Sequence, residues 1–159
     1  MIAGMINGGE AESADISAWL YDSFCEAISA DGVTAGVACL SAGAAQIFAE
    51  VLRTENIPYT VIIPSEDYEE HFDHRVDQLN YLTLLPHASE VIKLPYKEFT
   101  PGVGAKAEGM VIDMAEIVYM VAKGSARPLD PRQAKLYDLS VEKKKKMVRF
   151  NILNGVVTR

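Results

Sequence analysis

Residues 41–44 are a turn of small side chains whose types and spacing suit anion binding. The apolar run Val33–Leu40 before it predicts a buried strand, and apolar residues recur every three or four positions from Ala44, which predicts a helix. A strand, a tight turn and a helix N-terminus together direct backbone N–H groups toward one point. The sequence therefore indicates a phosphate or nucleotide site, and an ordinary strand-to-helix connection is the alternative. The candidate binding residues are Ser41, Ala42, Gly43 and Ala44.

Three carboxylates are candidates for sugar binding or acid–base chemistry. Glu66 and Asp67 follow the apolar run Tyr59–Ile63, and an acid just beyond a strand end can accept hydrogen bonds from ribose hydroxyls. Asp113 stands at the end of a predicted helix, where the helix dipole disfavours an acid, so we expect it to have a partner or a role. Glu66 and Asp113 are the candidates for catalysis, which needs a carboxylate within reach of the reacting group. Solvated surface carboxylates are the alternative for all three.

The sequence shows no established catalytic or metal motif. His71 and His74 would share one face of a helix with Asp67 nearby, but no third ligand has metal-site spacing. A nucleophile elbow, a Walker loop and a Cys–His arrangement are all missing from the sequence. Tyr68 and Phe72 either stack on a base or pack over the edge of the sheet. We therefore expect no metal and no cofactor.

The elements that position these residues alternate between strands and helices. Five strands are predicted, and a helix pattern follows each of the first four; parallel neighbours need such crossovers, so we expect a mostly parallel five-stranded sheet with helices on both faces. Ligands of open parallel sheets bind beyond the carboxyl ends of the strands. The predicted strands are 2–6, 33–40, 59–63, 89–94 and 117–121. The loops beyond their ends add further candidate ligand-binding residues, namely Asn7, Gly8, Gly9, Lys123, Gly124 and Ser125.

The chain changes character after about residue 127. The run Lys143–Lys146 predicts a solvated helix end or loop, with a nucleic-acid patch as the alternative. The alternation in Met147–Leu153 predicts one more strand, at an edge of the sheet. Asn154 and Gly155 are a turn signal that lets the last residues pair back as a hairpin. We expect one domain, with a core of about residues 1–127 and a C-terminal extension over 128–159.

Composition limits the partners and the location. The chain has 159 residues and a net charge of −7, which argues against non-specific binding to nucleic acid or an anionic membrane. No apolar run is long enough to span a membrane, and the N-terminus lacks the pattern of a signal peptide. Cys25 and Cys39 form no metal pattern and are expected to be buried free thiols. We expect a cytoplasmic protein without nucleic-acid or membrane partners.

Four segments in order resemble the SLOG superfamily, which includes the "lonely guy" phosphoribohydrolases and the DNA-processing protein A type. The segments are Leu40–Glu50, Val61–Pro64, Asp67–Phe72 and Met110–Val118. The resemblance covers about residues 33–122 and is stronger to small bacterial members of unassigned function. It implies a Rossmann-like three-layer fold, an anion site at the turn of residues 41–44, and a nucleotide or nucleotide-derived signal as ligand. It also implies a homodimer built through helices, for which the stripe 103–114 is the candidate.

The chain departs from this family at two loops. Relatives carry Gly-His-Arg after the first strand, where this sequence reads Asn7-Gly8-Gly9. They also carry a Gly-Gly-Thr turn after the fifth strand, where Lys123–Pro128 stands here, and no catalytic glutamate follows it. Lys123 and Arg127 are the candidate phosphate cations. The resemblance therefore implies nucleotide binding or sensing, with an N-glycosidic hydrolase or a ligand-free interaction domain as alternatives.

Overall fold

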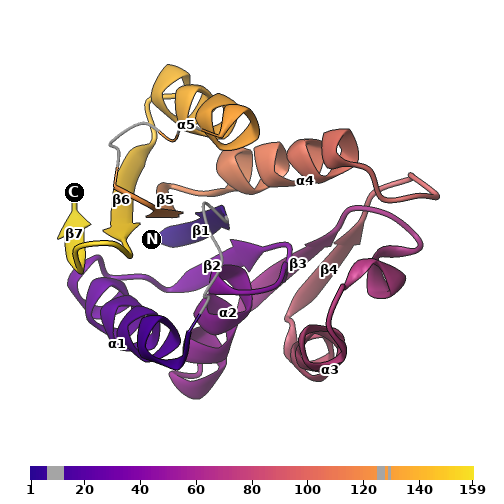
Figure 1. Cartoon of the computed structure of the whole chain (residues 1–159), viewed down its shortest axis with the longest axis horizontal. Helices are drawn as coiled ribbons and strands as arrows, with labels where there is room; N and C mark the ends of the chain where they lie inside the picture. Colours follow the sequence, from indigo (N-terminus) through magenta and orange to yellow (C-terminus); the bar gives the residue numbers. More distant parts are fainter. Residues whose placement is uncertain (7–12, 125–127, 129) are drawn as a thin grey trace.

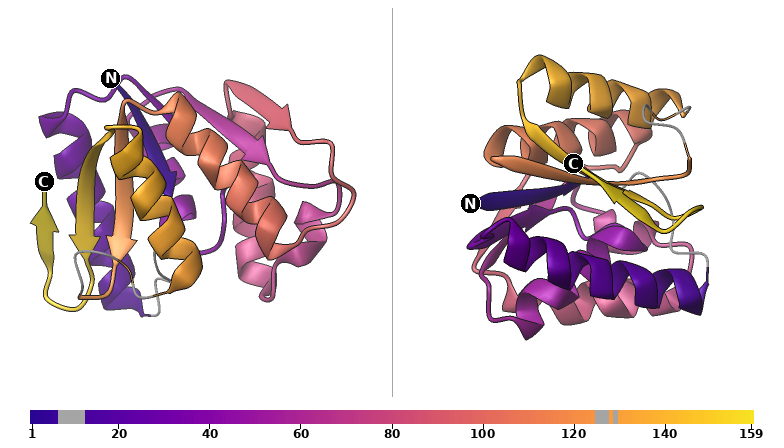
Figure 2. Two further views of the ribbon diagram at one scale, coloured as in Figure 1. Left: turned by 90° about the horizontal axis from the view of Figure 1, so that it is seen from above. Right: turned by 90° about the vertical axis from the view of Figure 1, so that its left-hand side faces the viewer.

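The computed structural model describes residues 1–6, 13–124, 128 and 130–159, and these form one seven-stranded sheet between two helical layers (Figures 1 and 2). The strand order is β4-β3-β2-β1-β5-β6-β7. The strands are β1 Ile2–Ile6, β2 Ala35–Ala38, β3 Tyr59–Ile63, β4 Glu90–Lys93, β5 Ile117–Ala122, β6 Lys146–Asn151 and β7 Val156–Thr158.

Helices α1, α2 and α3 cover one face of the sheet, and α4 and α5 cover the other (Figure 1). Their bounds are α1 Ala14–Ala30, α2 Ala44–Thr54, α3 Arg75–Leu84, α4 Pro101–Met114 and α5 Pro131–Glu142, with short 3₁₀ turns at Tyr68–His71 and Leu85–His87. Within the part of the chain that the structure describes, no helix is long and apolar enough to cross a bilayer.

The strand order places a switch point between β1 and β5. The chain moves outward from β1 through β2, β3 and β4, and then returns to the other side of β1 with β5 and β6. All of these strands pair in parallel, and β7 pairs with β6 in the antiparallel sense. Their carboxyl ends therefore meet at one edge of the sheet, which is where ligands bind in open sheets of this kind.

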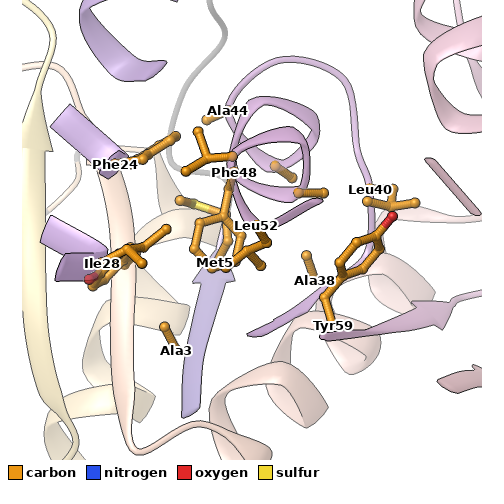
Figure 3. Packing of buried hydrophobic residues seen from close by; sticks show 14 of the residues in the cluster. Ala3, Met5, Phe24, Ile28, Ala38, Leu40, Ala44, Phe48, Leu52 and Tyr59 are labelled. Atoms are coloured by element: carbon orange, nitrogen blue, oxygen red, sulfur yellow. The ribbon is translucent and has the colours of Figure 1, made fainter. Parts of the chain in front are cut away.

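Aromatic side chains fill the core on the α1–α2 side of the sheet (Figure 3). The ring centroid of Phe24 lies 5.9 Å from that of Phe48 and 4.8 Å from that of Phe150, both in edge-to-face geometry. Two glycines bring strands and helices close together. A Cβ atom on Gly36 would lie 2.3 Å from Leu52 Cδ1, and one on Gly4 would lie 2.8 Å from Ala115 Cβ.

The structure confirms the α/β class and the mostly parallel sheet, but the prediction of five main strands is wrong. β6 is an interior strand, parallel to β5, because β7 adds the edge beyond it. The predicted C-terminal hairpin is present. The stripe proposed for a dimer instead packs largely onto the sheet, since Ala107, Val111 and Ile112 are buried; the homodimer stays a prediction.

Helix α5 was not predicted. Asp130 caps it, because its side chain accepts hydrogen bonds from the backbone N–H groups of Arg132 and Gln133, and Pro131 occupies the first turn. An Asp-Pro pair of this kind is a helix-start signal. Helix α4 begins at Pro101, two residues before the stripe of residues 103–114, with Thr100 as its cap.

Candidate functional site

The turn after β2 has an unusual backbone. Leu40 has a φ of 55° although its side chain is fully buried, and Gly43 has a φ of 88°. Bulky residues seldom adopt a positive φ, and such strain is concentrated at functional sites. The two left-handed residues reverse the chain, so that Ser41 and Ala42 lie at the carboxyl edge of the sheet directly before α2.

Gln46 holds this turn in place from the first turn of α2. Its side chain is almost entirely buried, and its Nε2 donates to the backbone oxygen of Leu40 at 3.2 Å and to that of Asp77 at 2.9 Å. The side-chain amide of Gln46 therefore holds the strained Leu40 in place and links it to α3. Gln46 is a site residue that the sequence did not reveal.

Among the residues that the structure describes, the N-cap position of α2 provides no side-chain hydrogen bond to the helix. The N-cap residue is Gly43, whereas the side chains of Ser13, Thr100 and Asp130 cap α1, α4 and α5. The first N–H groups of a helix have no intrahelical partner, and the helix dipole adds a partial positive charge there. The start of α2 can therefore donate hydrogen bonds to an anion.

Ser41 carries an unpaired polar atom at the same point. Its Oγ is buried and has no hydrogen-bond partner among the residues that the structure describes. Leaving a buried hydroxyl unpaired costs about 1–3 kcal/mol, so such groups are rare and call for an explanation. A bound group that accepts or donates a hydrogen bond at Ser41 would remove that cost.

Two cavities meet at this turn. The larger, about 770 Å³, runs between α2 and α3 and is here called the α2–α3 groove. The smaller, about 230 Å³, lies between the first turns of α4 and α5 and is here called the α4–α5 cavity. Ser41 and Arg132 line both of them. Arg132 was not a predicted site residue, because it belongs to the unpredicted helix α5.

The lining of the α2–α3 groove is strongly polar. Arg53 and Arg132 bring positive charge, and Glu50, Asp73 and Asp77 bring negative charge. His71 and His74 also line it, but in the described part of the chain no group of three or more His, Cys, Asp or Glu residues is placed to hold a metal ion. The groove thus offers hydrogen-bonding groups of both kinds along most of α2.

The predicted loops have different positions. Ser41, Ala42 and Gly43 line the groove, and Ala44 is buried beneath them. Lys123 and Gly124 follow β5, and Gly124 exchanges two hydrogen bonds with the side chain of Asn151. Four predicted residues, and Arg127, lie outside the residues that the structure describes. These four are Asn7, Gly8, Gly9 and Ser125.

Glu66 and Asp67 lie away from the turn. Glu66 lines a separate cavity of about 690 Å³ beside β4. Asp67 stabilises its own loop, because its Oδ1 accepts from Ser65 Oγ at 2.7 Å and from the backbone N–H of Phe99 at 2.8 Å. Tyr68 is buried and its ring contacts that of Phe99, which favours the packing alternative over base stacking.

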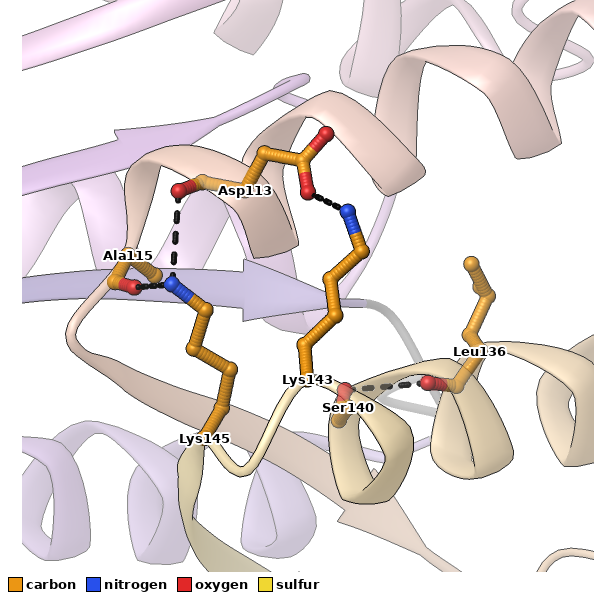
Figure 4. Close-up of polar contacts among 6 residues, drawn as sticks. All are labelled: Asp113, Ala115, Leu136, Ser140, Lys143 and Lys145. Carbon is orange, nitrogen blue, oxygen red and sulfur yellow. Dashed lines mark hydrogen bonds and ion pairs between the residues drawn. The ribbon is translucent and has the colours of Figure 1, made fainter.

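Asp113 lies at the other end of the sheet. It is near the C-terminal end of α4, just before β5 begins, and it pairs with Lys143 (Figure 4). Lys145 Nζ donates to the backbone oxygens of Asp113 and Ala115, at 3.4 and 2.7 Å. The expected partner is thus the lysine run after α5, where a cation suits the C-terminal carbonyl groups of α4. Neither cavity at Ser41 includes Asp113.

The thiol in the α4–α5 cavity is not activated. Cys39 lines this cavity, and burial raises its pKa well above the usual value. Both cysteines are free, but Cys25 is only partly buried, so the expectation of two buried thiols holds for Cys39 alone. The thiolate is the nucleophilic form of cysteine, so the neutral thiol of Cys39 lines the cavity without acting as a nucleophile.

Comparison with known proteins identifies relatives by structure alone. No family model matches the sequence, and no curated protein sequence matches it. The molybdenum cofactor binding protein of Rippkaea orientalis is 11% identical, over 94% of this chain and 76% of that chain, with a TM-score of 0.59. DNA processing protein A of Streptococcus pneumoniae is 11% identical over 96% of this chain and 52% of that one, with a TM-score of 0.68. The same protein from Helicobacter pylori is 14% identical over 94% and 64%, with a TM-score of 0.64.

The prediction that nucleic acid is excluded is wrong. It came from the net charge alone, yet DNA processing protein A of Helicobacter pylori, which shares the fold, is described by its single-stranded DNA binding mode. The total charge of a chain does not decide what one edge of its sheet binds, because local cations and helix N-termini act at short range.

These similar structures include the DNA processing protein A type, which the sequence segments also resemble. They cover almost the whole of the described fold, including the C-terminal part that the sequence resemblance did not reach. The chain therefore has the Rossmann-like α/β fold of these structures, which is the fold that the resemblance to the SLOG superfamily implied.

Proposed function

We propose that the chain binds a nucleotide-type ligand and holds its phosphate group at the turn of residues 41–44. The buried Ser41 Oγ, which has no hydrogen-bond partner in the described part of the chain, is the observation that carries this proposal. A phosphate oxygen beside it would pair this hydroxyl and also accept from the first N–H groups of α2.

Two further features support a phosphate at this position. Gly43 at the start of α2 has no side chain, so the N-cap residue itself leaves the helix N-terminus open to an anion. The strained Leu40 is held by Gln46, and this fixes the turn before any ligand arrives. A preorganised turn loses little conformational entropy on binding, which favours affinity.

The proposal is binding or sensing rather than catalysis. Cleavage of an N-glycosidic bond needs a carboxylate within hydrogen-bonding reach of the reacting group. Glu66 and Asp113, the two candidates from the sequence, line neither cavity at the turn. No sequence motif assigns a catalytic role to the carboxylates that do, such as those of Glu50, Asp73 and Asp77. A ligand-free interaction domain is the remaining alternative, and it accounts less well for the unpaired hydroxyl.

The test is a binding screen on the wild-type chain. Thermal shift followed by calorimetry would use nucleoside mono- and diphosphates, cyclic nucleotides, NAD and ADP-ribose. A short single-stranded oligodeoxynucleotide belongs in the panel, because one similar structure is described as binding single-stranded DNA. Saturable binding of at least one probe is expected. If none binds, the proposal fails, and release of free base on long incubation would show that the site is catalytic.

An acidic substitution locates the phosphate. Ala42→Asp places a carboxylate beside the start of α2, where the helix dipole favours it by about 0.3–1 kcal/mol, so the fold should persist. The same carboxylate would repel a bound phosphate, and at least a tenfold loss of affinity is expected. Gly102→Asp is the matched control, because it puts an equal charge in the first turn of α4, where Gly102 is exposed. Equal affinities for the two variants would contradict a phosphate at residues 41–44.

A further inference from the structure

The ligand site continues over both faces of the sheet. The groove is lined largely from α2 and α3, and the α4–α5 cavity largely from α4 and α5; these two pairs of helices cover opposite faces of the sheet (Figure 1). Both reach the carboxyl end of β2, where Ser41 and Arg132 line each of them. Building on the proposed nucleotide function, we propose that the ligand has two parts joined by its phosphate linkage. One flat ring enters the α4–α5 cavity, and a larger polar part extends along the groove.

The two volumes support a division of the ligand. Sites for a complete small molecule occupy about 300–1,000 Å³. The α4–α5 cavity, about 230 Å³, is smaller than this range and suits one part of a ligand. The groove, about 770 Å³, has room for a sugar, a second base and their linkage.

The walls of the small cavity match a flat heterocycle. Pro64, Phe99 and Pro101 supply apolar and aromatic surface, on which a ring can stack. Glu108 stands in the same lining and can accept hydrogen bonds from the N–H edge of a base. A base with several ring or amino N–H donors fits this cavity better than one with acceptors alone.

Arg132 stands where the two parts of the ligand meet. Its guanidinium presents donors in a fork that matches two phosphate oxygens, which favours a phosphate or pyrophosphate linkage. The cation comes from the first turn of α5, although Lys123 and Arg127 were the residues expected to supply it. Asp130, the cap of α5, already occupies backbone N–H groups there, so the side chain of Arg132 is the contribution of α5 to the anion.

The test compares one-part and two-part probes. ADP and GDP are the one-part probes, and NAD and pyrophosphate-linked diguanosine are the two-part probes. Ala105→Leu fills the α4–α5 cavity from α4, and Asn80→Phe obstructs the groove from the exposed side of α3. Melting temperatures of both variants check that they fold, and calorimetry gives the affinities.

We expect the better two-part probe to bind at least tenfold more tightly than the matching one-part probe. Asn80→Phe should remove that advantage and leave one-part affinity unchanged, whereas Ala105→Leu should weaken both kinds of probe at least tenfold. The proposal is overturned if two-part probes gain nothing, or if Ala105→Leu leaves every affinity unchanged. If the wild-type chain binds only the one-part probes, the two-part proposal fails and the proposed phosphate site at residues 41–44 is retained. Failure of all four probes, with none of the wider panel bound, would overturn both proposals.

Discussion

Ser41→Ala should raise the stability of the free protein and lower its affinity for the ligand. The substitution removes the buried Oγ that has no partner in the described structure and leaves the methyl-sized remainder of the side chain in place. Since a buried unpaired group costs about 1–3 kcal/mol, we expect a gain near the lower end, because the residue itself lines two cavities and is only partly buried. One kcal/mol raises the melting temperature of a chain of this size by about 2–4 °C.

The loss of affinity comes from the same atom. A hydrogen bond to a charged group contributes about 1.5–3 kcal/mol, which corresponds to a loss of roughly 10- to 150-fold in affinity. Differential scanning calorimetry of the free variant measures the first effect, and isothermal titration with the probe found in the screen measures the second. The two effects have opposite signs, so general damage to the fold cannot produce both.

Ser65→Ala is the matched control at the end of the neighbouring strand. Ser65 is also buried, but its Oγ donates to Asp67 Oδ1 at 2.7 Å. Removal of this bond to a carboxylate should destabilise the chain by about 1.5–3 kcal/mol and leave affinity unchanged. If Ser41→Ala lowers the melting temperature as Ser65→Ala does, then Ser41 has a partner in the folded chain and the argument for an incomplete site is refuted.

Other substitutions and conditions test the remaining assignments. Asp67→Ala should lower the free energy of unfolding in urea by about 2–4 kcal/mol, because two partly buried donors lose their acceptor. Asp113→Asn should change stability by less than about 1 kcal/mol, since its pair with Lys143 is exposed, and it should not alter ligand affinity. Burial raises the pKa of Tyr81 from 10.0 to about 12; the folded state favours the neutral phenol, so stability should fall as pH rises above 10, and less steeply in Tyr81→Phe. Cys39 should resist alkylation in the native protein at mildly alkaline pH and react after unfolding, as measured by peptide mass.

Local signals account for most of what the sequence predicted about the fold. The β-branched run Tyr59–Ile63 lies between two prolines, and the structure places β3 over those same residues. Ser13 stands directly before α1, and its side chain accepts a hydrogen bond from the N–H of Ile16, three residues further on. In both cases the decisive interactions lie within a few residues, so the sequence contains them directly.

The position of β6 could not be read in the same way. A strand at the edge of a sheet alternates between apolar and polar residues. An interior strand shows the same alternation when helices cover one of its faces more than the other. Val148 and Phe150 join the core beside Phe24 and Tyr119, while β7 extends the sheet on the open side. Pairing of this kind depends on contacts between distant parts of the chain, which periodicity does not report.

The residues of the candidate site also differ in whether local sequence could reveal them. The turn of residues 41–44 is contiguous in sequence, and its small residues directly before a helix predicted an anion-binding site. Arg132 comes from a helix more than 80 residues further along the chain, although the Asp-Pro signal before it could have revealed that helix. Gln46 carried no signal at all, because a buried amide is recognised only by the carbonyl groups of Leu40 and Asp77 that it contacts.

The turn after β2 combines two local costs. Leu40 is held in a left-handed conformation, which costs of order 1–3 kcal/mol, and the hydroxyl of Ser41 is buried without a partner in the described residues. The buried side chain of Gln46 holds that conformation through its hydrogen bond to the backbone oxygen of Leu40. The fully buried side chain of Leu40 offsets the cost of its own backbone, whereas a turn shaped only for stability would have alanine at position 41. The opposite effects expected of Ser41→Ala on stability and affinity follow from this reasoning. The free protein becomes more stable because an unpaired hydroxyl is removed, and affinity falls because the ligand pairs with that hydroxyl.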